Sequence, residues 1–338
     1  MNPPPRLTPS EAISATELAR KGKFKESGIK GSAALAHADK TTVRMAGLSR
    51  RIVSFSLFGS EPGYCETAIL NAQAMGQLYP GWEMWVFHDN TVPTSVLQRL
   101  EAAGAHLTTP SEWGIAHWPG TFWRFAALLF PHTEKVIFRD ADSVVSIRES
   151  ALVSVWLTSG KPFHVLRDWY SHVDLILAGL WGAHAPFLGD IRSLVEAFLG
   201  QGNLHPTHAD QHFLAESIWP RIRDYVLEHD SIHSGPNIVA FDAPNAAANG
   251  KNALGGFRLN QLSFVLDSGW SGPYDFVILD GRKQAVCSYR RAFVAGKDSV
   301  EIPYEYNDRI NSKQWEVALR RVSVAPTIQV RLSPTGRA

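Results

Sequence analysis

The stretch KVIFRDADS, residues 135–143, joins a short apolar run to two carboxylates and decides the fold class. Its apolar triplet VIF, with no polar residue inside it, is typical of a strand that is buried on both faces, as in a parallel sheet. Asp140 and Asp142 follow directly, and a spacing of one residue places both side chains on one face of an extended backbone. We therefore expect a buried strand that ends in a pair of carboxylates.

Strand and helix patterns alternate on the N-terminal side of this stretch. The expected strands are residues 52–58, 82–88, 105–108 and 135–138, and the expected helices are residues 65–78, 96–103 and 121–130. Such alternation predicts an α/β fold with a mainly parallel central sheet flanked by helices. In sheets of this kind ligands bind beyond the carboxyl ends of the strands, and Ser56, Asp89 and Asp140 are all expected at such ends.

Composition and charge exclude several classes of protein. The chain has 338 residues, of which 45% are hydrophobic and 19% charged, which is too much apolar material for a disordered chain. A net charge of +1 gives no electrostatic basis for binding nucleic acid. The longest apolar run, residues 175–183, is far shorter than the ~20 residues of a membrane span, which leaves only peripheral docking on a membrane open. We expect a cytoplasmic protein in which Cys65 and Cys287 are reduced thiols.

The paired carboxylates suit a hard divalent cation. Mg²⁺ and Mn²⁺ prefer oxygen ligands, and Mg²⁺ is commonly held by one or two carboxylates together with substrate phosphates. An ion bound in this way neutralises the charge on a leaving diphosphate. The alternative is a surface turn with two solvated carboxylates, and the buried strand that precedes Asp140 argues against it.

In this setting residues 136–143 resemble the strand and Asp-x-Asp motif of GT-A glycosyltransferases. The resemblance is to bacterial proteins described as polysaccharide glycosyltransferases, which are distantly similar to glycosyltransferase family 8. Other segments follow in the family's order over about residues 51–231. They are YPGW (79–82), FWRF (122–125), SIRE (146–149), GKPFH (160–164), AGLWG (178–182), ADQ (209–211) and HDS (229–231).

The resemblance implies roles for residues around the motif. Asp140 and Asp142, with Ala141 between them, match the residues that bind the metal ion and the diphosphate. Arg124 matches a basic residue that steers the nucleotide or the sugar. Ser56, at the end of the first strand, is expected in the same donor site. The alternative for Arg124 is a plain ion pair with a carboxylate.

Two later segments are implied to border the donor sugar. Ala178 and Gly179 resemble an Asn-Ala-Gly turn, in which a glycine allows the ring to approach the backbone closely. Leu177 stands where the family has Asn, so the chain departs from the family at that position. Asp210 and Gln211 resemble an Asp-Gln pair on the reactive side of the sugar, although Asp210 is equally suited to cap a helix over residues 211–218.

The third protein ligand of the metal is implied to be His229 or Asp230. The resemblance further implies residues 51–321 as one GT-A domain, with a donor-binding half at 51–145 and an acceptor half at 146–321. Residues 1–50, which contain five lysines and a single aromatic residue, are expected to form a flexible basic leader, and residues 322–338 a tail.

The activity implied by the resemblance is metal-dependent hexosyl transfer, as in polysaccharide biosynthesis. The donor is a nucleotide-diphosphate sugar, with a UDP-sugar favoured, and the acceptor is a hydroxyl of a glycan or another molecule. The cofactor is Mn²⁺ or Mg²⁺, and the anomeric configuration is implied to be retained. The sequence does not indicate the acceptor or the oligomeric state.

Two other functions stay as alternatives. A strand with Asp-x-Asp, followed here by Ser143, also resembles the first motif of haloacid-dehalogenase-type Mg²⁺-dependent phosphatases, in which the first Asp is a nucleophile. That family has the motif on its first strand and a second acidic pair later, whereas here the motif follows the fourth expected strand and Asp190 has no acidic partner. The other alternative is a catalytically degenerate GT-A-like binding protein, which the departure at Leu177 keeps open.

Overall fold

The computed structural model describes the chain from residue 49 to residue 322 with several gaps. The described residues are 49–202, 205, 207–235, 238–242, 253–256, 258–265, 272–293 and 297–322. The leader expected at residues 1–50 and the tail expected at 322–338 lie almost wholly outside them. In the described part of the chain, no helix is both long enough and apolar enough to cross a membrane.

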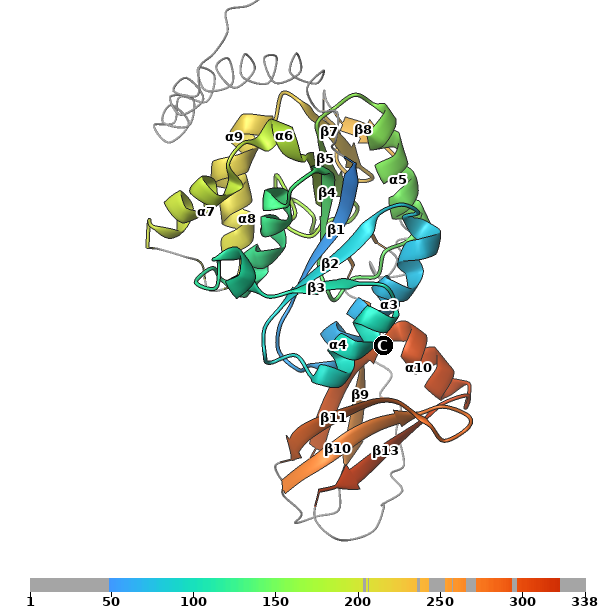
Figure 1. Ribbon diagram of the computed structural model, residues 1–338. Coiled ribbons are helices and arrows are strands. Elements are labelled where there is room, and N and C mark those ends of the chain that lie inside the picture. Colours follow the sequence, from blue (N-terminus) through green and yellow to red (C-terminus); the bar gives the residue numbers. More distant parts are fainter. Residues whose placement is uncertain are drawn as a thin grey trace, which may run out of the picture.

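An eight-stranded sheet forms the centre of the molecule (Figure 1). Its strands lie in the order β3-β2-β1-β4-β6-β5-β7-β8, and β6 runs antiparallel to both neighbours while the other pairs are parallel. The strands are β1 (Arg50–Leu57), β2 (Glu83–His88), β3 (His106–Thr108), β4 (Thr133–Arg139), β5 (Phe163–Arg167), β6 (Trp181–His184), β7 (Val226–Asp230) and β8 (Ile238–Ala240). The expected α/β fold with a mainly parallel sheet is confirmed, and the four expected strands correspond to β1 to β4.

Helices cover both faces of this sheet (Figure 1). One face carries α3 (Pro62–Leu78), α4 (Thr94–Ala102) and α5 (Ile147–Thr158). The other face carries η2 (Pro110–Trp113), η3 (Gly120–Leu129), α6 (Ala185–Leu188), α7 (Ile191–Leu199), α8 (Ala209–Phe213), the π-helical turn η4 (Leu214–Ile218) and α9 (Trp219–Ile222). The helices expected at residues 65–78 and 96–103 are therefore confirmed as α3 and α4.

The helix expected at residues 121–130 needs a correction, because η3 is a 3₁₀ helix. Its residues from Phe122 to Ala127 are all buried, so this segment is enclosed on every side rather than amphipathic. Pro119 and Pro131 bound the segment closely. The sequence pattern did not separate the two kinds of helix.

The residues of β1 alternate between the two faces of the sheet, as the period of a strand requires. Val53, Phe55 and Leu57 belong to the core shared with α3 and α4. Ser54 and Ser56 point the other way, towards η3, where their hydroxyl groups contact a helix backbone. This alternation brings η3 against the carboxyl end of β1.

A second unit of antiparallel strands follows the central sheet. Its elements are β9 (Leu259–Val265), β10 (Gly272–Leu279), β11 (Ala285–Phe293), β12 (Lys297–Pro303), α10 (Tyr304–Asn311) and β13 (Glu316–Arg321). They form one sheet of order β11-β10-β13 and one pair β12-β9. The topology thus changes between β8 and β9, whereas the boundary expected at residues 145 and 146 falls inside the eight-stranded sheet.

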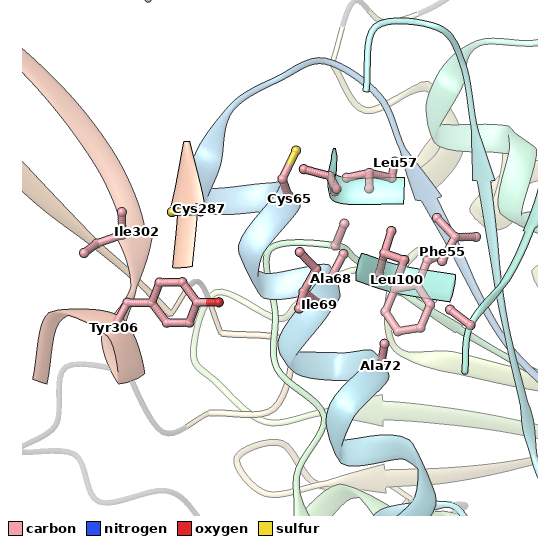
Figure 2. Packing of buried hydrophobic residues seen from close by; sticks show 14 of the residues in the cluster. Phe55, Leu57, Cys65, Ala68, Ile69, Ala72, Leu100, Cys287, Ile302 and Tyr306 are labelled. Atoms are coloured by element: carbon pink, nitrogen blue, oxygen red, sulfur yellow. The ribbon is translucent and has the colours of Figure 1, made fainter. Parts of the chain in front are cut away.

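Helix α3 lies between the central sheet and this C-terminal unit (Figure 2). Phe55 and Leu100 pack on one side of α3, and Ile302, Cys287 and Tyr306 lie on its other side. A single apolar core therefore includes both units. Cys65 and Cys287 are both buried free thiols, which confirms the expectation of reduced cysteines.

A closed polar network also joins α3 to the C-terminal unit. The Glu66 carboxylate is fully buried and accepts two hydrogen bonds from Arg99, at 2.8 and 2.7 Å. The hydroxyl of Tyr306 donates to the same carboxylate at 2.7 Å, and that of Tyr289 donates to its other oxygen. Because Arg99 is on α4 and the tyrosines are on α10 and β11, this network connects four elements. We refer to these four residues as the closed network.

Candidate functional site

The candidate site lies at the carboxyl ends of β1 and β4. These two strands are parallel neighbours, and the strand order reverses between them because β2 and β3 lie on one side and β6, β5 and β7 on the other. The crevice at such a reversal is the usual ligand site of open α/β sheets. Asp140 and Asp142 follow the end of β4, so the structure places the predicted carboxylates at this reversal.

The end of β4 sends successive side chains to opposite faces. Arg139 pairs at 2.7 Å with Glu149 of α5, on the face of the sheet that carries α3. Asp140 points to the other face, towards η3, and its side chain is 44% exposed. One oxygen of Asp140 accepts a hydrogen bond from Arg124, and the carboxylate still faces solvent.

Asp142 is only partly exposed and stands next to a second negative charge. Burial, followed by the charge of Asp140, raises the pKa of Asp142 to about 6. Two crowded carboxylates of this kind are stabilised by a cation placed between them. The donor set therefore fits a hard divalent ion held by both aspartates and by phosphate oxygens, and on this account Asp140 and Asp142 would hold it.

Arg124 bridges two carboxylates that are far apart in the sequence. Its Nη1 donates to Asp140, and its Nη2 donates to Oδ2 of Asp210 at 2.8 Å. Arg124 is only 4% exposed, and its burial opposes the charge, but Asp140 and Asp210 outweigh that effect and raise its pKa. Burial also raises the pKa of Asp210. The bridge joins η3, β4 and α8 in one charged cluster, which we call the open network: Arg124, Asp140, Asp142 and Asp210.

Two serines of β1 fix the backbone of Arg124. The Ser54 hydroxyl donates to the Arg124 carbonyl at 2.8 Å, and the Ser56 hydroxyl accepts from the Arg124 amide at 2.9 Å. Ser56 was predicted to bind the donor. Its hydroxyl accepts from the Arg124 backbone amide and so helps to hold the η3 backbone that carries Arg124, and donor binding by Ser56 stays a prediction.

A buried asparagine holds the turn after the paired aspartates. Asn71 of α3 donates to the Ser143 carbonyl and accepts from the Val145 amide, both at 2.9 Å. Asn71 is fully buried. Its two hydrogen bonds therefore hold one carbonyl and one amide of the backbone that follows Asp142. This contact was not predictable from the sequence, because Asn71 lies in the middle of a helical pattern.

Gly179 lies directly against Asp140. A Cβ atom at this glycine would stand 3.0 Å from the Asp140 backbone nitrogen and would overlap with the Asp140 carboxylate. Ala178, beside it, is buried. The structure thus brings the predicted Ala178–Gly179 turn to the aspartate pair, and it does so because only a bare backbone fits there.

Gln211 lies next to the open network. Its backbone amide donates to Asp210 at 3.0 Å, and its buried side-chain oxygen has no hydrogen-bond partner. The helix that contains both residues begins at Ala209, and His208 rather than Asp210 occupies the N-cap position. Asp210 is therefore not the N-cap of this helix, and its side chain instead forms an ion pair with Arg124.

Tyr64 is a member of the site that the sequence analysis did not predict. Its phenol hydrogen-bonds Asp142, and burial, then the charges of Asp142 and Glu301, raise its pKa to about 12. Tyr64 is on the first turn of α3, and Glu301 is on β12, so the C-terminal unit reaches the rim of the site. Pro62 at the first helical position was the available signal, since it extends α3 to include Tyr64.

The structure does not bring His229 or Asp230 to the aspartate pair. His229 is buried in β7, with its Nδ1 2.8 Å from Nε2 of His164, and burial lowers its pKa. Asp230 is buried and hydrogen-bonds His233. Over the residues that the structure describes, no three His, Cys, Asp or Glu side chains gather as a metal site. The predicted third ligand is thus not found at either position.

Comparison with known protein families gives no match to any family model. No curated protein matches the sequence either. The function of the chain must therefore be argued from its own residues.

Among solved structures the chain is similar to several glycosyltransferases, at low identity. One is the mannosyltransferase PcManGT from Pyrobaculum calidifontis in complex with GDP-Man and Mn²⁺, at 14% identity and a TM-score of 0.37, covering 70% of this chain and 69% of that one. Another is glucosyl-3-phosphoglycerate synthase from Mycobacterium tuberculosis, at 14% identity and 0.37, covering 63% and 78%. A third is an active-site mutant of LgtC, at 15% and 0.36, covering 54% and 73%.

Proposed function

We propose that the protein is a metal-dependent glycosyltransferase that uses a nucleotide-diphosphate sugar as donor. The observation that carries the proposal is the geometry of Asp140: it stands at the strand-order reversal, pairs with buried Arg124, and touches the bare backbone of Gly179. The resemblance of residues 136–143 to the GT-A motif supports the same reaction. A hexosyl donor, with a UDP-sugar favoured, and a glycan or other hydroxyl acceptor belong to this proposal.

The reaction transfers the sugar from its diphosphate to an acceptor oxygen. The bond between the anomeric carbon and the diphosphate breaks, a new bond to the acceptor oxygen forms, and the acceptor proton leaves on the diphosphate. When bound, Mn²⁺ or Mg²⁺ supplies Lewis-acid stabilisation of the departing diphosphate. Retention of the anomeric configuration rests on the resemblance to family 8 and is part of the proposal.

The residues of the chain hold the groups that react. Asp140 and Asp142 offer carboxylate oxygens to the cation. Arg124 keeps a positive charge beside Asp140 and forms a second ion pair with Asp210. These fixed charges are therefore already in place before the donor binds. Gln211, next to Asp210 in sequence, has a buried side-chain oxygen without a hydrogen-bond partner, and its assignment to the sugar rests on the resemblance. Gly179 allows the Asp140 carboxylate to lie directly against its backbone.

No observation favours the phosphatase alternative. A phosphatase of that type needs its first aspartate free for attack on phosphorus, whereas Asp140 is ion-paired with Arg124. The degenerate alternative predicts that the carboxylates no longer bind a cation with a nucleotide, and it is settled by the same experiment as the main proposal.

The test is thermal unfolding of the full chain with UDP, GDP, CMP and dTDP, each with and without Mn²⁺. A ligand at a hundred times its dissociation constant adds about 2.7 kcal/mol of stability, which shifts the midpoint by several degrees. We expect one nucleoside diphosphate to stabilise the wild type only with Mn²⁺, and Asp142→Ala to lose the shift. If no nucleotide shifts folded wild-type protein, the proposal is wrong.

A further inference from the structure

A second group of polar and aromatic side chains lies on the same edge of the sheet as the aspartate pair, at the ends of β5 and β7. It consists of Trp169, Tyr170 and His172, from the segment after β5, and His233, from the segment after β7. We call these four residues the β5–β7 rim. None of them takes part in the open network, and the inference drawn from them rests on the proposed function.

The rim stands on a fixed base. Asp168, the first residue after β5, is fully buried and is held by Arg148 at 2.8 Å and by the Leu254 amide at 2.7 Å. The segment then turns back on itself, because the His172 amide donates to the Trp169 carbonyl at 2.9 Å. The side chains of this segment are therefore presented by an anchored turn.

The two histidines of the rim are held in opposite tautomers by their partners. Nδ1 of His172 accepts from the Asp168 amide at 3.2 Å, so in neutral His172 the proton is on Nε2. Nδ1 of His233 lies 3.1 Å from the Asp230 carboxylate, which can only accept, so the Nε2 of neutral His233 carries a lone pair. Burial lowers the pKa of His172, which keeps it neutral near pH 7. The rim therefore offers one N–H donor, on His172, and one lone pair, on His233, which is the pair that a hydroxyl group needs.

The aromatic residues of the rim supply a surface for a ring. Trp169 and Tyr170 meet edge to face with their centroids 5.3 Å apart, and Tyr170 is 62% exposed. A tyrosine this exposed beside a tryptophan offers an amphipathic surface for a ring. The side chain of His233 is 38% exposed, so it too is open to a ligand.

The register of the sheet sets the separation between the rim and the aspartate pair. Phe138, Trp181, Val165 and Glu228 lie in one row across β4, β6, β5 and β7, so Asp140 and Asp230 are at the same level two residues further on. Three steps between strands make this about 14 Å. A single sugar ring is shorter than this span, whereas an oligosaccharide that begins at the donor site reaches the rim.

We propose that the β5–β7 rim binds a glycan acceptor of at least two sugar rings, with its aromatic pair stacked on one ring and its imidazoles bonded to hydroxyl groups. The charges around the rim favour a neutral ligand, because the carboxylates of Asp168 and Asp230 are already paired with Arg148 and Arg167. A metal ion is disfavoured, since the described residues gather no three-ligand group at the rim.

The test uses calorimetric titration of the full chain with linear tetrasaccharides of glucose, galactose, mannose and N-acetylglucosamine. We expect at least one to bind, and Tyr170→Ala and His233→Ala each to weaken it about tenfold, as the loss of one stacking or hydrogen-bond contact implies. His117→Ala is the matched control, because His117 is likewise exposed and bonded to a carboxylate, Glu196 at 2.8 Å, on another element. That variant should bind the glycan as the wild type does.

The same titrations with UDP or GDP and Mn²⁺ separate this inference from the proposed function. Nucleotide binding should be unchanged in Tyr170→Ala and His233→Ala, whose folding is checked by circular dichroism. Nucleotide binding without binding of any tetrasaccharide, or equal glycan affinity in wild type and both variants, overturns the inference and leaves the proposed function standing. The inference is also wrong if the protein binds phosphatidylcholine vesicles through Tyr170 and does not bind the glycans. Glycan binding without nucleotide binding overturns the proposed function instead.

Discussion

Two arginine–carboxylate networks lie on opposite faces of the same sheet. They differ in whether a carboxylate keeps unused capacity to accept a ligand. In the closed network the Glu66 carboxylate is 0% exposed, and both its oxygens are filled by Arg99, Tyr289 and Tyr306. In the open network Asp140 keeps 44% of its side chain exposed although it is paired with buried Arg124.

The difference separates a structural ion pair from a candidate site. A buried carboxylate whose oxygens are all satisfied has nothing left to offer a ligand, and it contributes to the joint between two units of the fold. A carboxylate that is paired on one side and open on the other, with a second carboxylate beside it, has unused acceptor capacity and unfavourable charge. The predictions below use this contrast, in order of decreasing effect.

The largest effect is expected from Glu66→Ala, which leaves Arg99 without its anion and two tyrosines without an acceptor. Removing one partner of a buried ion pair costs about 3–5 kcal/mol. Urea denaturation should show a loss of this size. Glu61→Ala is the control, because the Glu61–Arg291 pair at 3.0 Å has a carboxylate that is 63% exposed, and it should cost less than ~1 kcal/mol. A Glu66 variant as stable as the control would break the description of the closed network.

Arg124→Lys is expected to affect both stability and binding. A single ammonium group cannot bridge Asp140 and Asp210, so one charged hydrogen bond is lost at about 1.5–3 kcal/mol. The affinity for the nucleotide with Mn²⁺ should fall by at least about tenfold, measured by calorimetry. Arg99→Lys, in the closed network, should lose similar stability and keep its nucleotide affinity. Equal binding losses in both variants would remove the distinction between the two networks.

Gly179→Ala tests the close approach of the backbone to Asp140. The added Cβ must displace the Asp140 carboxylate, and overpacking of this kind costs about 1–3 kcal/mol. Nucleotide binding with Mn²⁺ should weaken together with stability. Gly76→Ala is the matched control, since a Cβ there meets nothing within 4 Å and the site is inside α3. The control should gain up to about 1 kcal/mol, and a Gly179 variant that behaves in the same way contradicts the placement of the turn.

The smallest effect, and one of opposite sign, is expected from Asp142→Asn in the absence of metal. Because the folded pKa of Asp142 is raised from 3.8 to about 6, the ionised carboxylate destabilises the folded state. This penalty is absent below pH ~4, grows as the pH rises towards 6, and is full at pH 7. With allowance for partial exposure, the variant should be more stable than wild type by about 1–2 kcal/mol at pH 7 and equal to it at pH 4.

Urea denaturation in EDTA at the two pH values measures this difference. A difference that does not change with pH would show that the Asp142 carboxylate is not the cause. A variant that is less stable than wild type at pH 7 would contradict the crowding of the two carboxylates.

The parts of the site that were predictable from sequence are those set by local pattern. Asp140 and Asp142 follow from the apolar strand before them and from their own spacing. Arg124 and Asp210 were each expected in the site, but their ion pair joins residues 86 positions apart, and no local pattern encodes such a contact.

The third metal ligand, predicted at His229 or Asp230, depends on the register of a strand, which no local pattern determines. His229 and Asp230 are adjacent, and on a strand adjacent side chains point to opposite faces. The register pairs His229 with Leu166 in the row below the strand end, and its imidazole packs against His164 inside the protein. If that register is not known, a histidine near the end of β7 can be read either as a metal ligand or as a core residue.

The C-terminal unit was missed although a signal for it existed. Phe276 to Leu279 form an apolar run bounded by Asp275 and Asp280, as expected of a buried strand, and Tyr274, Phe276 and Ile278 enter the core around α3. Its role could not be inferred from that pattern, because the effect of the Glu301 charge on the pKa of Tyr64 depends on how two units of the fold pack.

The measurement that tests the central claim most directly is the binding of Mn²⁺ itself, followed by the electron paramagnetic resonance signal of the free ion. If Asp140 and Asp142 hold the ion against a diphosphate, Mn²⁺ should bind weakly to the wild type alone and at least about tenfold more tightly with the preferred nucleoside diphosphate. Asp142→Asn should abolish the gain, and Glu66→Gln should keep it. Tight nucleotide binding with no dependence on Mn²⁺, or a gain that survives in Asp142→Asn, would contradict the account.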